Sequence, residues 1–230
     1  MNQTQNCFIN GQWVAGHGQT LSSTNPATNT IVWQTPSANA DDVEAAFAAA
    51  EKAFADWALM SPANRIAILE KYKALLEANK AALADAIMVE TGKPRWESQT
   101  EVASMIAKVD VSVKSYHERT PTKSAGEGDK TLLTHRPHGV CAVFGPYNFP
   151  GHLPNGHIIP ALIAGNTIVF KPSEQAPLIG AMMVQLLHDA GVPSGVVNFV
   201  VGELETAKAI VANDKLRGFF FTGSSAVGTI

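Results

Sequence analysis

Four short apolar segments in the second half of the chain limit its fold more than any other feature. Their sequences are VCAVFG, TIVFK, VVNFVV and GFFFTG, which begin at residues 140, 167, 196 and 218. The segments between them, 150–164, 177–190 and 204–212, have compositions compatible with helices. Apolar, β-rich strands that alternate with helices are typical of a parallel sheet covered by helices on both faces. The sequence therefore predicts an α/β fold in this half.

The start of the chain has a different pattern. In FINGQWV, residues 8–14, apolar and polar residues alternate around Asn10-Gly11, and this pair is a strong signal for a β-hairpin. A stretch rich in Ser, Thr, Asn and Pro follows, and we expect it to be irregular to about Asn39.

Helical patterns fill the next eighty residues. From Asp41, apolar residues recur at three- and four-residue steps, and Ser61-Pro62 has the composition of a second helix start. A further helical run reaches Gly92, and another extends from about Trp96 to His117. The first half is therefore predicted to be mainly helical.

Residues 119–137, RTPTKSAGEGDKTLLTHRP, separate the two halves. They are polar and turn-rich, with Gly126 to Gly128 between two segments of strand-like composition. This pattern predicts a β-hairpin, and a disordered linker is the alternative. We therefore divide the chain into a helical part (1–118), a hairpin (119–138) and a sheet part (139–230).

Charge and hydropathy exclude two kinds of partner. The formal net charge is −3 and the pI is about 6.1, which argues against binding to a nucleic-acid backbone. No apolar run approaches the roughly 18 to 20 residues that span a bilayer. The first residues, MNQTQNCFING, lack the basic start and apolar core of a secretory signal. We expect a cytoplasmic protein that binds neither nucleic acid nor membrane.

The cysteines and histidines do not indicate a metal site. Cys7 and Cys141 are the only cysteines, and no CxxC pair is present. Cys141 lies in the apolar segment VCAVF, which favours a core thiol over a nucleophile. Four histidines lack HExxH spacing and nearby acidic or thiol ligands, so we expect no metal; they are His135, His138, His152 and His157.

The end of the first predicted strand presents an asparagine between prolines, in GPYNFP. The prolines and glycines of this segment restrict its backbone, so that Asn148 is held in a defined place. Its amide could donate a hydrogen bond to an oxygen that gains negative charge. Alternatively, Asn148 caps the helix predicted to begin at Pro150.

The end of the second strand, FKPSE, supplies a lysine and a carboxylate in a turn fixed by proline. Glu174 can accept hydrogen bonds from both hydroxyls of a ribose, and Lys171 can donate to the same sugar. Because Glu174 would repel a 2′-phosphate, NAD is favoured over NADP. The alternative is a solvated ion pair on a loop.

The end of the fourth strand, FFFTGSSAVG, is a glycine turn that enters a helix. Such a turn exposes backbone N–H groups to an anion, and Ser224 adds a hydroxyl. Gly223 and Gly228 do not form the GxGxxG fingerprint. An ordinary strand-to-helix cap explains this segment about as well.

In this order, GPYNFP, PALIAGNTIVFKPSE and FFFTGSSAVG resemble the aldehyde dehydrogenase superfamily. ETGKPRWES (90–98) and HRPHGVCAVFGPYNFPGHLPNGHIIPAL (135–162) closely resemble its N-succinylglutamate 5-semialdehyde dehydrogenases of bacterial arginine degradation, and GHLPNGH is the discriminating segment. The resemblance covers essentially the whole chain. It implies a Rossmann-type NAD-binding part, preceded by a helical region and interrupted by a β-hairpin arm through which family members form homo-oligomers.

The resemblance also implies roles for individual residues. Asn148 would stabilise the oxyanion formed during oxidation of an aldehyde substrate. Lys171 and Glu174 would hold the adenosine ribose of NAD. Gly202 would lie near the adenine, although this chain has Glu203 where relatives often have a small residue. Gly223, Ser224 and Gly228 would approach the pyrophosphate or pack the helix beneath it.

The family's catalytic cysteine and glutamate have no match in this chain, since both lie downstream of the last motif. We therefore expect the N-terminal part of a longer NAD-dependent enzyme, inactive by itself, whose reaction converts N-succinylglutamate 5-semialdehyde to N-succinylglutamate. An enzyme for another small aldehyde and a non-catalytic nucleotide-binding module are the alternatives.

Overall fold

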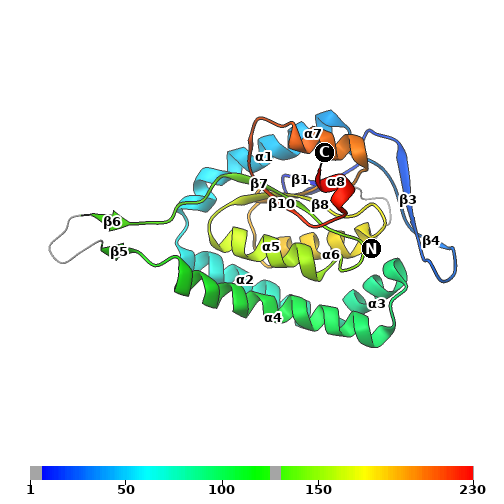
Figure 1. Cartoon of the computed structure of the whole chain (residues 1–230), viewed down its shortest axis with the longest axis horizontal. Coiled ribbons are helices and arrows are strands. Elements are labelled where there is room, and N and C mark those ends of the chain that lie inside the picture. The colour runs from blue at the N-terminus through cyan, green and yellow to red at the C-terminus, as the bar shows by residue number, and fades with distance from the viewer. Residues whose placement is uncertain (1–6, 125–130, 230) are drawn as a thin grey trace.

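The computed structural model describes residues 7–124 and 131–229, and a six-stranded sheet lies at its centre (Figure 1). The strands are β1 (Cys7–Ile9), β2 (Gln12–Val14), β7 (Val140–Phe144), β8 (Thr167–Lys171), β9 (Val197–Phe199) and β10 (Leu216–Phe221). Their order is β10-β7-β8-β9-β1-β2. In this order, the four strands from β10 to β9 are parallel to one another, which confirms the predicted parallel sheet. β1 runs antiparallel to both of its neighbours.

Helices cover both faces of the sheet, as predicted. They are α1 (Ala40–Leu59), α2 (Pro62–Ala78), α3 (Lys80–Thr91), α4 (Arg95–Arg119), α5 (His152–Ile163), α6 (Pro177–Asp189), α7 (Leu204–Val211) and the single turn α8 (Ser225–Gly228). α5 and α6 pack on one face, and α1 and α7 pack on the other (Figure 1). α2, α3 and α4 form an outer layer over α5 and α6.

Alternate residues of the central strands pack into two separate cores. In β7, Cys141 and Val143 belong to the core beneath α5 and α6, whereas Ala142 and Phe144 belong to the core beneath α1. Every residue of β7 and β8 is buried. Burial on both faces explains why these strands are continuous apolar runs in the sequence.

The hairpin predicted at Asn10-Gly11 is confirmed and joins the edge of the main sheet. Asn10 and Gly11 both have positive φ, 51° and 81°, as a type I′ turn requires. Phe8 pairs with Phe199 of β9, and the Asn10 N–H donates to the Asn198 side chain at 3.0 Å. The first strands of the chain therefore complete a sheet whose other strands come from its second half.

The irregular stretch expected up to Asn39 was a wrong prediction. β3 (Thr20–Thr24) and β4 (Ile31–Pro36) form a separate antiparallel ribbon there. The turn between them is closed by the Asn25 N–H, which donates to the Thr30 carbonyl at 2.9 Å, and Asn29 has a φ of 56°. Ser and Thr residues on a ribbon with an exposed side resemble a loop in composition, although Thr is a good strand former.

The predicted hairpin between the two halves is present and projects from the body (Figure 1). β5 (Lys123–Ser124) pairs antiparallel with β6 (Leu132–Leu133). The turn predicted at Gly126 to Gly128 lies outside the described residues. Leu132 and Leu133 are exposed. A role of this hairpin in oligomerisation stays a prediction.

Within residues 7–124 and 131–229, no helix has the length and apolar character that crossing a membrane requires.

Candidate cofactor site

A hollow of about 890 Å³ opens where β7, β8 and β10 end. Ligands of parallel α/β sheets bind beyond the carboxyl ends of the strands, so its position is the one the fold favours. Five of the residues singled out in the sequence line it together: Asn148, Lys171, Glu174, Gly223 and Ser224. The structure thus brings three separate strand-end motifs to one place.

Asn148 lies in the turn between β7 and α5, and its side chain is exposed at the hollow. Among the described residues, its amide has no hydrogen-bond partner. The cap alternative is therefore wrong: α5 begins at His152 with Gly151 as N-cap and no side-chain cap from this turn. The N–H groups of Gly151 and His152 instead donate to the Glu101 carboxylate of α4, at 3.0 and 3.1 Å. The Asn148 amide is left available for a ligand.

Lys171 and Glu174 face each other across the turn that follows β8. The Lys171 Nζ lies 3.6 Å from the Glu174 carboxylate and donates to the Pro172 carbonyl at 3.2 Å. Burial lowers the pKa of Lys171, and the carboxylates of Glu174 and Glu203 oppose this shift. Lys171 is only 7% exposed, whereas the Glu174 side chain is 39% exposed, so the ion pair is buried at the lysine and open to solvent at the carboxylate.

Gly223 and Ser224 form the rim of the hollow above β10. A Cβ on Gly223 would lie 2.6 Å from the Phe221 ring, so only glycine lets the backbone fold over this side chain. Gly228 lies against the same ring and does not line the hollow. Its N–H donates to the Ser224 carbonyl at 3.0 Å, which closes the single turn of α8.

Gly202 does not line the hollow. A Cβ there would be 1.9 Å from the Thr206 hydroxyl, so Gly202 lets α7 pack closely on the end of β9. Its neighbour Glu203 lines the hollow in its place. Leu204 and Ala207 add apolar surface from α7. Apolar walls beside a carboxylate and an ammonium group suit a ligand with a planar ring and a sugar.

Neither cysteine of the chain can serve as a nucleophile in this hollow. Cys7 and Cys141 are both fully buried in the two cores, and neither lines the site. Burial raises the pKa of each thiol to about 11, which keeps it protonated at neutral pH. In the described part of the chain, no group of three His, Cys, Asp or Glu residues is arranged to hold a metal ion.

The role of Glu101 was not predicted from the sequence. The signal was present, because Glu101 falls on the buried stripe of α4 beside Val102 and Met105, where a charge needs a partner. Tyr147 and Phe144, which also line the hollow, were not singled out either.

Comparison with known proteins identifies the family. The aldehyde dehydrogenase family model matches residues 13–230. The chain belongs to the aldehyde dehydrogenase family. It is 54% identical over 224 residues to the N-succinylglutamate 5-semialdehyde dehydrogenase of Paraburkholderia xenovorans, a match that covers 97% of this chain and 46% of that protein. The chain therefore spans about half the length of the curated relatives it matches.

Solved aldehyde dehydrogenase structures have the same fold. Aldehyde dehydrogenase C of Pseudomonas syringae, a mutant complexed with NAD+ and octanal, superposes with a TM-score of 0.88 at 33% identity, covering 94% of this chain and 44% of that one. NADP-dependent glyceraldehyde-3-phosphate dehydrogenase of Bacillus halodurans, complexed with NADP, gives a TM-score of 0.92 at 29% identity, with 98% of this chain and 49% of that chain covered. Aldehyde dehydrogenases of this fold thus include NAD-bound and NADP-bound structures.

Proposed function

We propose that this chain forms the NAD-binding part of an aldehyde dehydrogenase that oxidises N-succinylglutamate 5-semialdehyde to N-succinylglutamate. The observation that carries the proposal is the meeting of Lys171, Glu174 and Asn148 in one hollow at the carboxyl ends of the parallel strands. The identity of 54% to a relative with that activity supports the choice of substrate.

The residues at the end of β8 fit the ribose of a dinucleotide. The Glu174 carboxylate accepts hydrogen bonds only, so it matches two ribose hydroxyls, and Lys171 is a donor beside it. A 2′-phosphate would bring two like charges together at Glu174. Structural neighbours include both NAD and NADP complexes, so the preference for NAD rests on this residue.

The exposed turn after β7 fits the reacting end of the substrate. There the Asn148 amide would donate a hydrogen bond to the aldehyde oxygen as it gains negative charge, and the loss of one such donor costs about 3 kcal/mol of transition-state stabilisation. NAD, when bound, accepts the hydride. Because both thiols of the chain are buried and protonated, we assign the nucleophile to a residue that this chain does not contain.

Two further properties belong to this proposal. We expect the hairpin of β5 and β6 to contribute to a homo-oligomer, because it projects from the body with Leu132 and Leu133 exposed. We also expect the protein to work in the cytoplasm.

Calorimetric titration of the 230-residue chain with NAD, and separately with NADP, tests the proposal. We expect saturable binding of NAD and much weaker binding of NADP. Equal binding of both would overturn the assignment of Glu174, and binding of neither would overturn the assignment of the hollow as a cofactor site formed by this chain. Mixing the chain with NAD and an aldehyde should produce no NADH, since no available thiol is present.

A further inference from the structure

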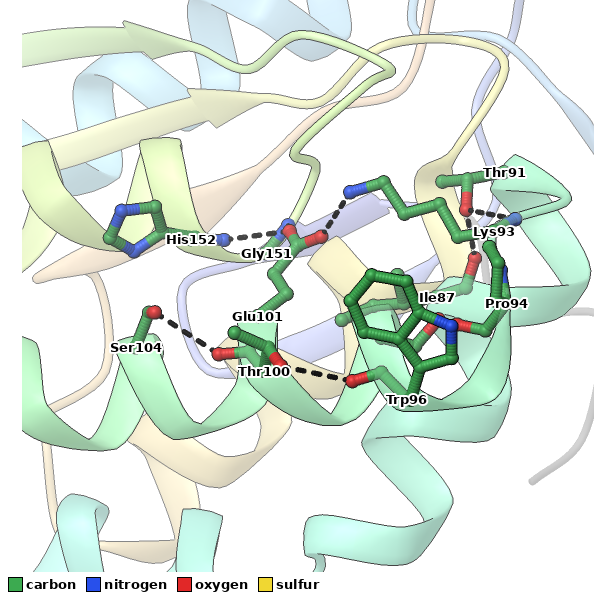
Figure 2. Close-up of polar contacts among 11 residues, drawn as sticks. Ile87, Thr91, Lys93, Pro94, Trp96, Thr100, Glu101, Ser104, Gly151 and His152 are labelled. Carbon is green, nitrogen blue, oxygen red and sulfur yellow. Dashed lines mark hydrogen bonds and ion pairs between the residues drawn. The ribbon is translucent and has the colours of Figure 1, made fainter.

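Glu101 connects the outer layer of helices to the turn that carries Asn148. Its side chain is fully buried at the interface of α4 and α5. One carboxylate oxygen accepts the N–H groups of Gly151 and His152, 50 and 51 residues away in the sequence. Figure 2 shows the carboxylate pointing from α4 to this helix start.

The second oxygen of the same carboxylate is held by Lys93. The Lys93 Nζ lies 2.7 Å from it, and the lysine side chain is only 12% exposed (Figure 2). Lys93 lies in the short link between α3 and α4, after Gly92, whose φ of 74° ends α3. The lysine backbone is therefore fixed by two helix ends, and its ammonium group is directed at the Glu101 carboxylate.

Lys93 also contacts the turn directly. Its Nζ lies 3.7 Å from the centroid of the Phe149 ring, a cation–π geometry. Through Lys93 and Glu101, the outer helices thus contact Phe149, Gly151 and His152, which are three of the four residues that follow Asn148.

These contacts decide what the Asn148 amide can do. A helix start attracts nearby acceptors to its unpaired N–H groups, and asparagine is among the residues preferred there. A carboxylate is the stronger acceptor, and its negative charge also interacts favourably with the helix dipole. Because Glu101 already occupies the N–H groups of Gly151 and His152, the Asn148 side chain has no acceptor role at α5.

We propose that Glu101 is a positioning residue for Asn148: with Lys93 it caps α5 from outside the turn, fixes the backbone of residues 149–152, and leaves the Asn148 amide facing the hollow. The catalytic meaning of this placement rests on the proposed function, whereas the placement itself does not. A buried ion pair contributes little net stability compared with apolar residues of the same size, so net stability alone does not account for a glutamate and a lysine at these positions.

Nuclear magnetic resonance of the side-chain amide tests the proposal in this chain. The chain is labelled with nitrogen-15 at asparagine, and the Asn148 amide signal is assigned by its loss in Asn148→Ala. We expect Glu101→Gln, which loses the charge that holds Lys93, to shift this signal by more than its line width. Lys93→Met, which leaves the Glu101 cap in place, should shift it as well.

Asp110→Asn is the matched control, because Asp110 lies on the same helix and forms an ion pair with Lys73 at 2.8 Å. It should leave the Asn148 signal unchanged. In Glu101→Ala, millimolar formate should return the signal toward its original position by occupying the vacated carboxylate site, and formate should have no effect on Glu101→Gln.

An unchanged Asn148 signal in folded Glu101→Gln or folded Lys93→Met would overturn the proposal. If the substitutions at Glu101 prevent folding, Lys93→Met decides the question alone. The amide signal is measured without NAD, so this failure is distinct from a failure of cofactor binding, which the calorimetric titration detects.

Discussion

The Glu90 carboxylate lies 2.6 Å from the backbone nitrogen of Leu178, at the first turn of α6. Its second oxygen accepts the N–H of Ile179 at 3.0 Å. Like Glu101 at α5, a buried glutamate of the helical first half thus caps a helix that follows a strand of the sheet. Burial raises the pKa of Glu90 from about 4.5 to about 8, although the two N–H groups act in the opposite direction.

This raised pKa predicts a pH dependence of stability. The folded chain keeps a proton on Glu90 that the unfolded chain releases above pH 4.5. The contribution of this proton to the free energy of unfolding is therefore complete below pH 4.5 and is lost as the pH rises through about 8. Between these two pH values the free energy of unfolding should fall as the pH rises. In Glu90→Gln we expect this fall to be smaller, by up to about 1.4 kcal/mol per pH unit. Urea unfolding at several pH values measures it. The exposed Glu77→Gln is the control, and an unaltered slope in Glu90→Gln would contradict the prediction.

Substitution of Asn148 should not affect stability. Its amide has no partner among the described residues, and Glu101 supplies the cap of α5. We expect Asn148→Ala to change the free energy of unfolding by less than about 0.5 kcal/mol, as is usual for exposed positions without special contacts. Chemical denaturation tests this. A loss of about 1 kcal/mol, typical of a removed cap, would show that Asn148 caps the helix in solution.

Alanine at Gly202 should be poorly tolerated. The new Cβ would meet the Thr206 hydroxyl, which donates to the Ala38 carbonyl at 2.7 Å. We expect Gly202→Ala to lower the free energy of unfolding by about 1 to 3 kcal/mol because α7 must shift. Gly156→Ala, inside α5, is the control. Its Cβ would make only ordinary contacts with Lys108 of α4, and the substitution should stabilise the chain by about 0.5 to 1 kcal/mol. Equal thermal melting points of the two variants would refute the steric argument.

Arg65 should contribute strongly to stability. Its buried guanidinium donates to the carbonyls of Trp57, Ala58, Met60 and Ile163, which joins the ends of α1 and α5. Arg65→Met leaves these carbonyls unsatisfied, and we expect a loss of about 2 to 4 kcal/mol in urea unfolding. Arg95→Met removes a more exposed ion pair with Asp85 and should cost less than about 1 kcal/mol. Similar costs for the two substitutions would contradict this reasoning.

Selection between cofactors should depend on Glu174. In Glu174→Gln, the repulsion of a 2′-phosphate is removed and one charged acceptor for the ribose is lost. We expect NAD binding to weaken by about tenfold, or about 1.4 kcal/mol, and the ratio of NAD to NADP affinity to fall. Calorimetry measures both affinities, with Glu205→Gln, an exposed residue of α7, as the control. An unchanged ratio would count against Glu174 as the selecting residue.

Much of the central sheet could be predicted because its strands are buried on both faces. VCAVF and TIVFK carry no polar alternation, which is typical of strands in a sheet covered by helices on both faces. The ribbon of β3 and β4 was missed because its Ser and Thr residues match the composition of a loop. The pairing of β1 with β9 was also missed, since no local pattern reports a contact between residues 8 and 199.

Some residues of the candidate site could likewise be predicted from the sequence, and others could not. The meeting of Asn148, Lys171 and Glu174 was predicted because each lies at or just after the end of a strand, and parallel strands end at one edge of the sheet. Glu101 and Glu90 were not predicted, because their contacts depend on how α3 and α4 pack against α5 and α6. The sign of their role in the sequence is that each acidic residue falls on the apolar stripe of its helix, among residues that are buried in the structure.

The place of β1 and β2 at the far edge of the sheet has a consequence for how the protein is made. Residues 7–14 leave the ribosome before the other strands of the main sheet, but their only neighbour in that sheet among the described strands is β9, which emerges about 190 residues later. Until β9 emerges, the edge of this hairpin that pairs with it has no native strand to bind. The time of greatest exposure to aggregation or to chaperones therefore precedes the emergence of Phe199.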